Sequence, residues 1–119
     1  MAKVSFTKLG LKSNNETVNI SFNEQEIEIK KYLPFEEKLE VISNIINQSI
    51  DGNGYYNPMR VELFTTLEIV FAYTNINFTE KMKAEPLKLY DILTSNDFYQ
   101  MIIENIDEFE YASIKNYVQ

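Results

Sequence analysis

The residue types best suited to binding a metal ion come together near the middle of the chain. Asp51, Asn53 and Glu62 stand at positions one, three and twelve of a calcium-binding loop. Position six of such a loop requires glycine for its sharp turn, but this chain has Tyr56 there, and Pro58 indicates that a helix starts inside the loop. The spacing favours a plain turn between two helices, and we expect neither a metal site nor a cofactor.

A second group of charged side chains is the acidic run Glu104, Asp107, Glu108 and Glu110 near the C-terminus. Two carboxylates that act as acid and base need one member with a raised pKa in a pocket, and no spacing here suggests such a pair. The run is either a solvated helix face, which we favour, or a docking surface for a partner rich in Lys and Arg.

Two absences restrict the chemistry further. The chain has no His and no Cys, so it lacks the commonest general base, the commonest transition-metal ligand and any thiolate. A Ser-His or Cys-His nucleophile pair is therefore impossible. We expect a protein that is not an enzyme and has no catalytic residues.

The charge is negative and unevenly distributed. The net charge is −7, with seven Lys/Arg and eight Asp/Glu in residues 1–60 but four and ten in residues 61–119. This balance favours a basic protein partner, or simply solubility, over nucleic acid, whose phosphates the C-terminal half would repel. No apolar run approaches the roughly 18 residues that span a bilayer, so we expect no membrane association.

The length and composition fit one α+β domain. A chain of 119 residues that is 45% hydrophobic can bury a core of its own. We predict a single domain over residues 1–119, strand-rich over 1–31 and helical over 32–119. Its architecture would be an N-terminal β-hairpin or small antiparallel sheet packed on a C-terminal bundle of four to five helices.

Alternating apolar residues predict the strands. Val4 and Phe6 indicate a short first strand. Two longer alternating runs, separated by the polar tripeptide 23–25, predict a hairpin with one buried face. That face would carry Val18, Ile20, Phe22, Ile27 and Ile29.

The first helix follows directly after the hairpin. Pro34 suits the first helical position, and Glu36 and Glu37 suit the first turn, where the helix dipole favours negative charge. We expect the hairpin to pack on one helical stripe, and the helix to stop at residues 51–54. The residues of this stripe are Phe35, Leu39, Ile42, Ile46 and Ile50.

A second helix should run from Asn57 as N-cap, through Pro58, to about Thr74. Apolar residues cover most of its circumference, so it is either central in the domain, which we favour, or exposes an interface. A short turn over residues 80–83, a third helix over 87–93, a fourth beginning near Phe98 and a last one opening at 107–110 complete the chain.

Several apolar and aromatic residues exceed what the hairpin needs and are candidates for contact with a partner. Val41 and Ile45 on the first helix are left either for the second helix or for a partner. Tyr55 and Tyr56 either are exposed contact residues or pack the turn. The full set of candidate partner-binding residues is Val41, Ile45, Tyr55, Tyr56, Val61, Ile69 and Tyr73.

The run from Ile27 to Lys38, Ile-Glu-Ile-Lys-Lys-Tyr-Leu-Pro-Phe-Glu-Glu-Lys, resembles a known family. It is similar to the small proteins of tailed bacteriophages of Gram-positive hosts, in particular to tail assembly chaperones. Those proteins often open with a strand pair that leads through a Leu-Thr/Pro-Phe-acid-acid junction into helices. The resemblance covers the pattern of residues 17–50, and the acidic helical remainder matches in character.

The resemblance implies a non-enzymatic protein that coats the tape-measure protein and recruits tail-tube subunits before it leaves the particle. The expected partners are these phage proteins or the chain itself, as a homo-oligomer, and the expected location is the host cytoplasm or the virion. Two alternatives remain: a structural virion component, such as a connector or minor tail protein, and a small inhibitor of a host protein. The family has no short signature of functional residues to transfer.

Overall fold

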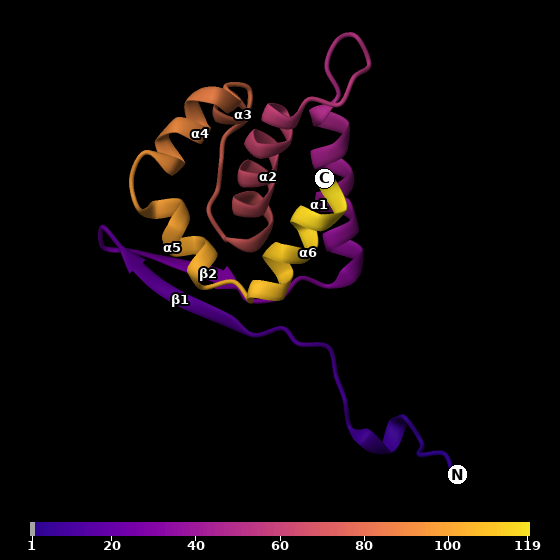
Figure 1. The fold of residues 1–119 in the computed structure, drawn as a ribbon. Helices are drawn as coiled ribbons and strands as arrows, with labels where there is room; N and C mark the ends of the chain where they lie inside the picture. The colour runs from indigo at the N-terminus through magenta and orange to yellow at the C-terminus, as the bar shows by residue number, and fades with distance from the viewer. Residues whose placement is uncertain (1) are drawn as a thin grey trace.

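The computed structural model describes residues 2–119 and has the expected α+β architecture: a two-stranded antiparallel sheet followed by six helices, five of them with seven or more residues (Figure 1). In this part of the chain no helix is long and apolar enough to cross a membrane. The elements are the 3₁₀ turn η1 (Thr7–Leu9), β1 (Thr17–Phe22), β2 (Gln25–Lys30), α1 (Phe35–Ser49), α2 (Pro58–Tyr73), α3 (Glu80–Lys83), α4 (Pro86–Thr94), α5 (Phe98–Glu104) and α6 (Glu108–Val118).

The hairpin has the register that its apolar alternation predicts. Val18 pairs with Ile29, and the next apolar pair is Ile20 with Ile27. Its turn contains two residues, Asn23 and Glu24, whose φ angles are 49° and 66°. The expected tripeptide turn is one residue too long, because residue 25 already belongs to β2. Positive φ at both central residues is the geometry that matches the twist of paired strands.

The strand β2 is the inner strand and β1 the outer one. Ile29 is fully buried, and the chain that follows α2 runs beside β2 (Figure 1). The N–H of Asn75 donates to the Glu28 carbonyl at 3.2 Å, and the Asn75 side-chain oxygen accepts from the Glu28 N–H at 2.9 Å. These contacts give the hairpin the support that an isolated two-stranded sheet lacks.

The buried face of α1 differs from the expected stripe. Phe35, Leu39 and Ile50 of that stripe are 61%, 49% and 44% exposed. The face turned inward instead contains Lys38. An apolar pattern assigns this charged residue to solvent, but it is buried here because it has a buried partner on α6. The buried residues of α1 are Lys38, Val41, Ile42, Ile45 and Ser49. Spacings of three and four keep these on one side of the helix.

The helix α2 is central, as expected, and contributes more buried residues than any other element. Its start matches the sequence prediction: Pro58 is the first residue, and the Asn57 side chain accepts hydrogen bonds from the N–H groups of Met59 and Arg60. The buried residues are Leu63, Phe64, Thr65, Thr66, Leu67, Ile69, Val70 and Tyr73. Helices α1, α4 and α6 all pack against α2 and account for this burial.

The expected strand at Val4 and Phe6 is wrong. These residues belong to an exposed segment, residues 2–12, which projects from the body and which we call the N-terminal arm (Figure 1). Its one regular element is η1, where Gly10 closes the turn at a φ of 69°. Alternation alone forms no strand where no neighbouring strand is available, and β1 pairs with β2.

Candidate functional site

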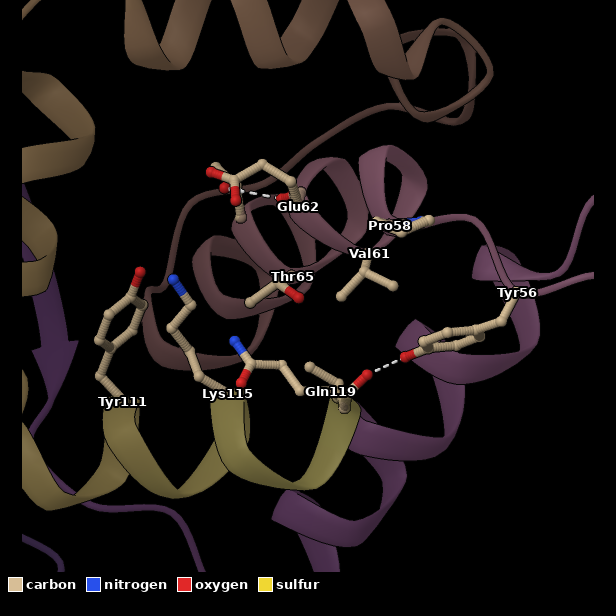
Figure 2. A pocket seen from close by; sticks show the side chains of 10 residues that line it. Tyr56, Pro58, Val61, Glu62, Thr65, Tyr111, Lys115 and Gln119 are labelled. Atoms are coloured by element: carbon tan, nitrogen blue, oxygen red, sulfur yellow. Dashed lines mark hydrogen bonds between the residues drawn. The ribbon is translucent and has the colours of Figure 1, made fainter.

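A pocket of about 350 Å³ opens between α2 and α6 (Figure 2). On one side lie Val61 and Thr65, one turn apart on α2, and on the other lie Tyr111 and Lys115, one turn apart on α6. Residues four apart share a helix face, so each helix presents a continuous wall to the pocket. The Lys115 ammonium lies 5.2 Å from the centre of the Tyr111 ring, which favours a cation there.

One end of the pocket is closed by Tyr56. Its hydroxyl donates to the carbonyl oxygen of Val118, which ties the end of α6 to the turn between α1 and α2. The backbone of Tyr56 is held in turn by a short antiparallel bridge to Ile50. Partial burial raises the pKa of the Tyr56 hydroxyl, because the ionised form loses solvation.

The wall of the pocket contains a hydroxyl group without a partner. Thr65 is 4% exposed, and within residues 2–119 its side-chain oxygen has no hydrogen-bond partner. Its neighbour Thr66 shows the usual arrangement, with the hydroxyl donating to the Glu62 carbonyl at 3.1 Å. A buried polar group without a partner costs free energy, so the Thr65 hydroxyl lowers the stability of the fold beside the pocket.

The lining of the pocket is of mixed character. Its walls combine apolar side chains with hydroxyl groups and two opposite charges, Glu62 and Lys115. Such a lining holds a short peptide segment or a small polar molecule by apolar contact and hydrogen bonds. Within the described residues, no three Asp or Glu side chains lie together as a metal site would need.

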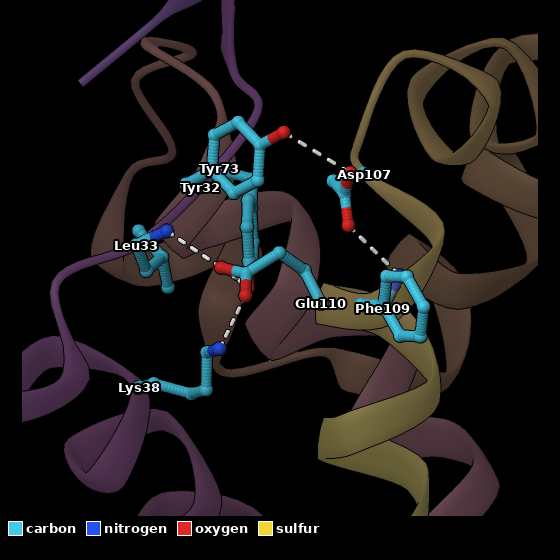
Figure 3. Close-up of polar contacts among 7 residues, drawn as sticks. All are labelled: Tyr32, Leu33, Lys38, Tyr73, Asp107, Phe109 and Glu110. Carbon is cyan, nitrogen blue, oxygen red and sulfur yellow. Dashed lines mark hydrogen bonds and ion pairs between the residues drawn. The ribbon is translucent and has the colours of Figure 1, made fainter. Parts of the chain in front are cut away.

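A buried carboxylate lies at the junction between the sheet and the helices (Figure 3). Glu110, from the first turn of α6, forms an ion pair with the Lys38 ammonium of α1. It also accepts from the N–H of Leu33 at 2.7 Å and from the hydroxyl of Tyr73 at 3.3 Å. Burial and the nearby carboxylate raise the pKa of Tyr73 far above its ordinary value. Glu110 thus joins α1, α2, α6 and the segment before α1.

Asp107 makes a second link at the same place. Its carboxylate accepts from the Tyr32 hydroxyl at 3.1 Å and from the N–H of Phe109 at 2.9 Å, which caps α6. Its N–H donates to the Lys31 carbonyl at 3.2 Å. Both interpretations of the acidic run are therefore wrong for Asp107 and Glu110, because these side chains hold the fold together, while Glu104 and Glu108 are exposed.

The Asp51 turn has a structural explanation. One oxygen of the Asp51 carboxylate, Oδ1, accepts from the N–H groups of Asn53 and Tyr55 at 2.9 and 3.1 Å and so holds the turn closed. Gly54 takes a φ of 83°, which glycine adopts without strain. These contacts match the plain interhelical turn that the spacing favours.

The seven candidate partner-binding residues separate into two groups. Tyr56 and Val61 line the α2–α6 pocket, and Tyr55 is 73% exposed in the turn between α1 and α2. The other four are at most 5% exposed, so the prediction that they contact a partner is wrong for this fold: Val41, Ile45, Ile69 and Tyr73. They complete the core around α2, which was one of the two alternatives for Val41 and Ile45.

Sequence reasoning missed Thr65, Tyr111 and Lys115 as pocket residues. The spacing of four between Tyr111 and Lys115 is visible in the sequence, but only the packing of α6 on α2 gives that face a partner. No sequence signal distinguishes Thr65, because its neighbour Thr66 is the same residue type and yet makes the ordinary helix contact.

Comparison with protein-family models, curated proteins and solved structures finds no match to this chain.

Proposed function

We propose that this chain is a non-enzymatic protein-binding module, and that it acts as a tail assembly chaperone of a tailed bacteriophage, with the tape-measure and tail-tube proteins as partners. The phage assignment is supported by the resemblance at residues 27–38. The binding role is supported by the N-terminal arm, which is the single observation that carries it.

Every residue of the N-terminal arm is exposed, although the arm is rich in large apolar side chains. Val4, Phe6, Leu9 and Leu11 are 57–73% exposed. Four such side chains within eight residues form an apolar surface that the fold does not cover, and surfaces of this kind mark interaction sites. Exposed apolar side chains also occur on the helices, such as Met59, Leu87 and Phe109, but the arm gathers four of them within one short segment.

The charge of the arm differs from that of the rest of the protein. Residues 2–12 carry three Lys and no Asp or Glu, whereas residues 13–119 carry eight Lys/Arg and all 18 Asp/Glu. A basic apolar arm on an acidic body can hold an aggregation-prone helical segment while the body keeps the complex soluble.

The proposal is tested with the full chain and a variant lacking residues 2–12. Tape-measure segments and tail-tube subunits from the same phage genome are offered to both, and binding is measured by calorimetry. We expect the full chain to bind and the deletion variant to bind at least about tenfold more weakly. Failure of the full chain to bind either partner would overturn the proposal.

Mass spectrometry of purified particles then separates a chaperone from a structural component. A chaperone leaves the particle, so its peptides should be absent from mature virions. Their presence in stoichiometric amount would favour a connector or minor tail protein instead.

A further inference from the structure

The arm needs a complementary surface, and a groove between α2 and α4 has the matching chemistry. This α2/α4 groove has a volume of about 430 Å³, and its lining is mainly apolar and aromatic: Met59, Leu63, Phe64, Pro86, Leu87 and Tyr90. Leu63 and Phe64 are buried, whereas Met59 and Leu87 are 83% and 74% exposed. Two apolar side chains so exposed beside one groove are unexplained by the packing of the monomer.

The arm presents its own apolar residues in a form that fits such a groove. Phe6 is the N-cap of the 3₁₀ turn and Leu9 is its last residue, and the N–H of Leu9 donates to the Phe6 carbonyl at 3.0 Å. Residues three apart in a 3₁₀ turn eclipse one another, so Phe6 and Leu9 project from the same side. The arm therefore presents a paired aromatic and aliphatic anchor.

The charges near the two surfaces are complementary. The arm carries Lys3, Lys8 and Lys12, and the groove has Glu62 in its lining. Asp91 follows Leu87 by four residues, which places it on the same side of α4. The Arg60 side chain in the same lining donates to the Gln48 carbonyl at 2.9 Å and stacks on the Phe64 ring, which fixes its position but leaves its positive charge. Arg60 therefore balances Glu62, and Asp91 supplies the remaining negative charge near the groove.

The arm and the groove lie at opposite ends of one molecule. Figure 1 shows the arm leaving the body beside the hairpin, whereas α3 and the start of α4 lie at the far end of the helical bundle. The arm of one molecule is thus placed to reach a different molecule rather than its own groove. Because the two surfaces differ, such contacts join copies head to tail.

We propose that the N-terminal arm of one copy docks in the α2/α4 groove of a second copy of this chain, with Phe6 and Leu9 as anchors. Head-to-tail docking builds a ring or a linear array. Such an array would place many copies along one long helical partner, so the arm would support binding of that partner by joining the copies. The inference uses the same arm as the proposed function, so its test must separate the two.

The first experiment measures molar mass by light scattering over protein concentrations from about 1 to 100 μM, the range in which micromolar affinity is visible. The arm variant is Phe6→Asp with Leu9→Asp, and the groove variant is Met59→Asp with Leu87→Asp. All four side chains are exposed, so each variant should fold. We expect the wild-type chain to exceed the monomer mass of 14.0 kDa with rising concentration, and each variant to remain monomeric.

Mixing the two variants gives the decisive result. The arm variant keeps an intact groove and the groove variant keeps an intact arm, so an equimolar mixture should form a 1:1 dimer and nothing larger. The matched control, Phe109→Asp with Tyr117→Asp, adds the same charge at exposed positions of α6 and should associate like the wild type. A monomeric wild type, or a mixture that stays monomeric, would overturn the inference.

Disulfide trapping identifies the surfaces, because the natural chain has no cysteine. Chains with Lys8→Cys and chains with Asp91→Cys are mixed and oxidised, and we expect a covalent dimer. A chain carrying both substitutions that forms only an internal disulfide would overturn the inference by showing docking on its own groove. A monomer that still binds tape-measure segments would overturn this inference and leave the proposed function standing.

Discussion

At the scale of single residues, the side chain that matters most for the fold is Glu110. We expect Glu110→Ala to lower the free energy of unfolding by about 3–5 kcal/mol, because it leaves the Lys38 ammonium buried without its counter-charge. It also removes the acceptor for the Leu33 N–H and the Tyr73 hydroxyl. Urea unfolding followed by circular dichroism measures the change.

The matched control is Glu108→Ala, two residues earlier in the same helix turn. Glu108 is exposed, so its removal should change the free energy of unfolding by no more than about 0.5 kcal/mol. Equal effects of the two substitutions would contradict the assignment of Glu110 as the structural carboxylate. Replacing both partners, Lys38→Met with Glu110→Leu, should recover much of the loss, because no unpaired charge then remains.

A second residue-scale prediction concerns Tyr99, whose hydroxyl is buried and forms no hydrogen bond of good geometry within residues 2–119, although the side chains of Thr66 and Tyr111 lie near it. We expect Tyr99→Phe to raise the free energy of unfolding by about 1 kcal/mol, because the hydroxyl loses its hydration on folding without a well-formed hydrogen bond in return. Urea unfolding at pH 8 measures it. Tyr117→Phe, at a position that is 59% exposed, is the control and should be neutral.

The buried tyrosines also predict the direction of the pH dependence. Burial raises the pKa of Tyr73 and of Tyr99 above the ordinary value of 10.0, so above pH 10 the unfolded chain loses these protons while the folded chain retains them. Stability is therefore present below pH 10 and falls as the pH rises above it. Urea midpoints at pH 8 to 11 measure the fall, which should be smaller in Tyr99→Phe. A urea midpoint that increases as the pH is raised from 10 to 11 would contradict this prediction.

At the scale of elements, the hairpin turn offers a test with opposite signs at two neighbouring sites. Glu24 has a φ of 66°, where a side chain is strained and glycine is not, so Glu24→Gly should stabilise the protein by about 1 kcal/mol. Glu26→Gly removes the same charge from the exposed face of β2 and should destabilise it by about 0.5–1 kcal/mol. Thermal unfolding measures both, and equal signs would show that the turn geometry does not limit stability.

At the scale of the whole molecule, the arm and the body should be energetically independent. All residues of the arm are exposed, so deleting residues 2–12 should change the free energy of unfolding by less than about 0.5 kcal/mol. Self-association should disappear in the same variant, and in the full chain it should weaken as salt screens the arm lysines from the acidic body. Light scattering at low and high salt measures this, and a salt-independent mass would contradict a role for charge.

The sequence by itself determined the local structure of this protein. The alternation of the two hairpin strands and the Asn57 cap with Pro58 both follow from contacts within a few residues. Such contacts are read directly from residue types and spacing. The α+β class and the central place of α2 followed from apolar periodicity alone.

Only the tertiary structure decided which surfaces are buried. The inward face of α1 depends on a carboxylate 72 residues away, since Glu110 makes burial of Lys38 possible and turns Phe35 and Leu39 toward solvent. The same packing buried Val41 and Ile69, brought Tyr111 opposite Thr65, and left the arm without a partner strand. Periodicity gives a helix one or more apolar faces, but which face is covered depends on residues far away in the chain, and these meet only in the folded molecule.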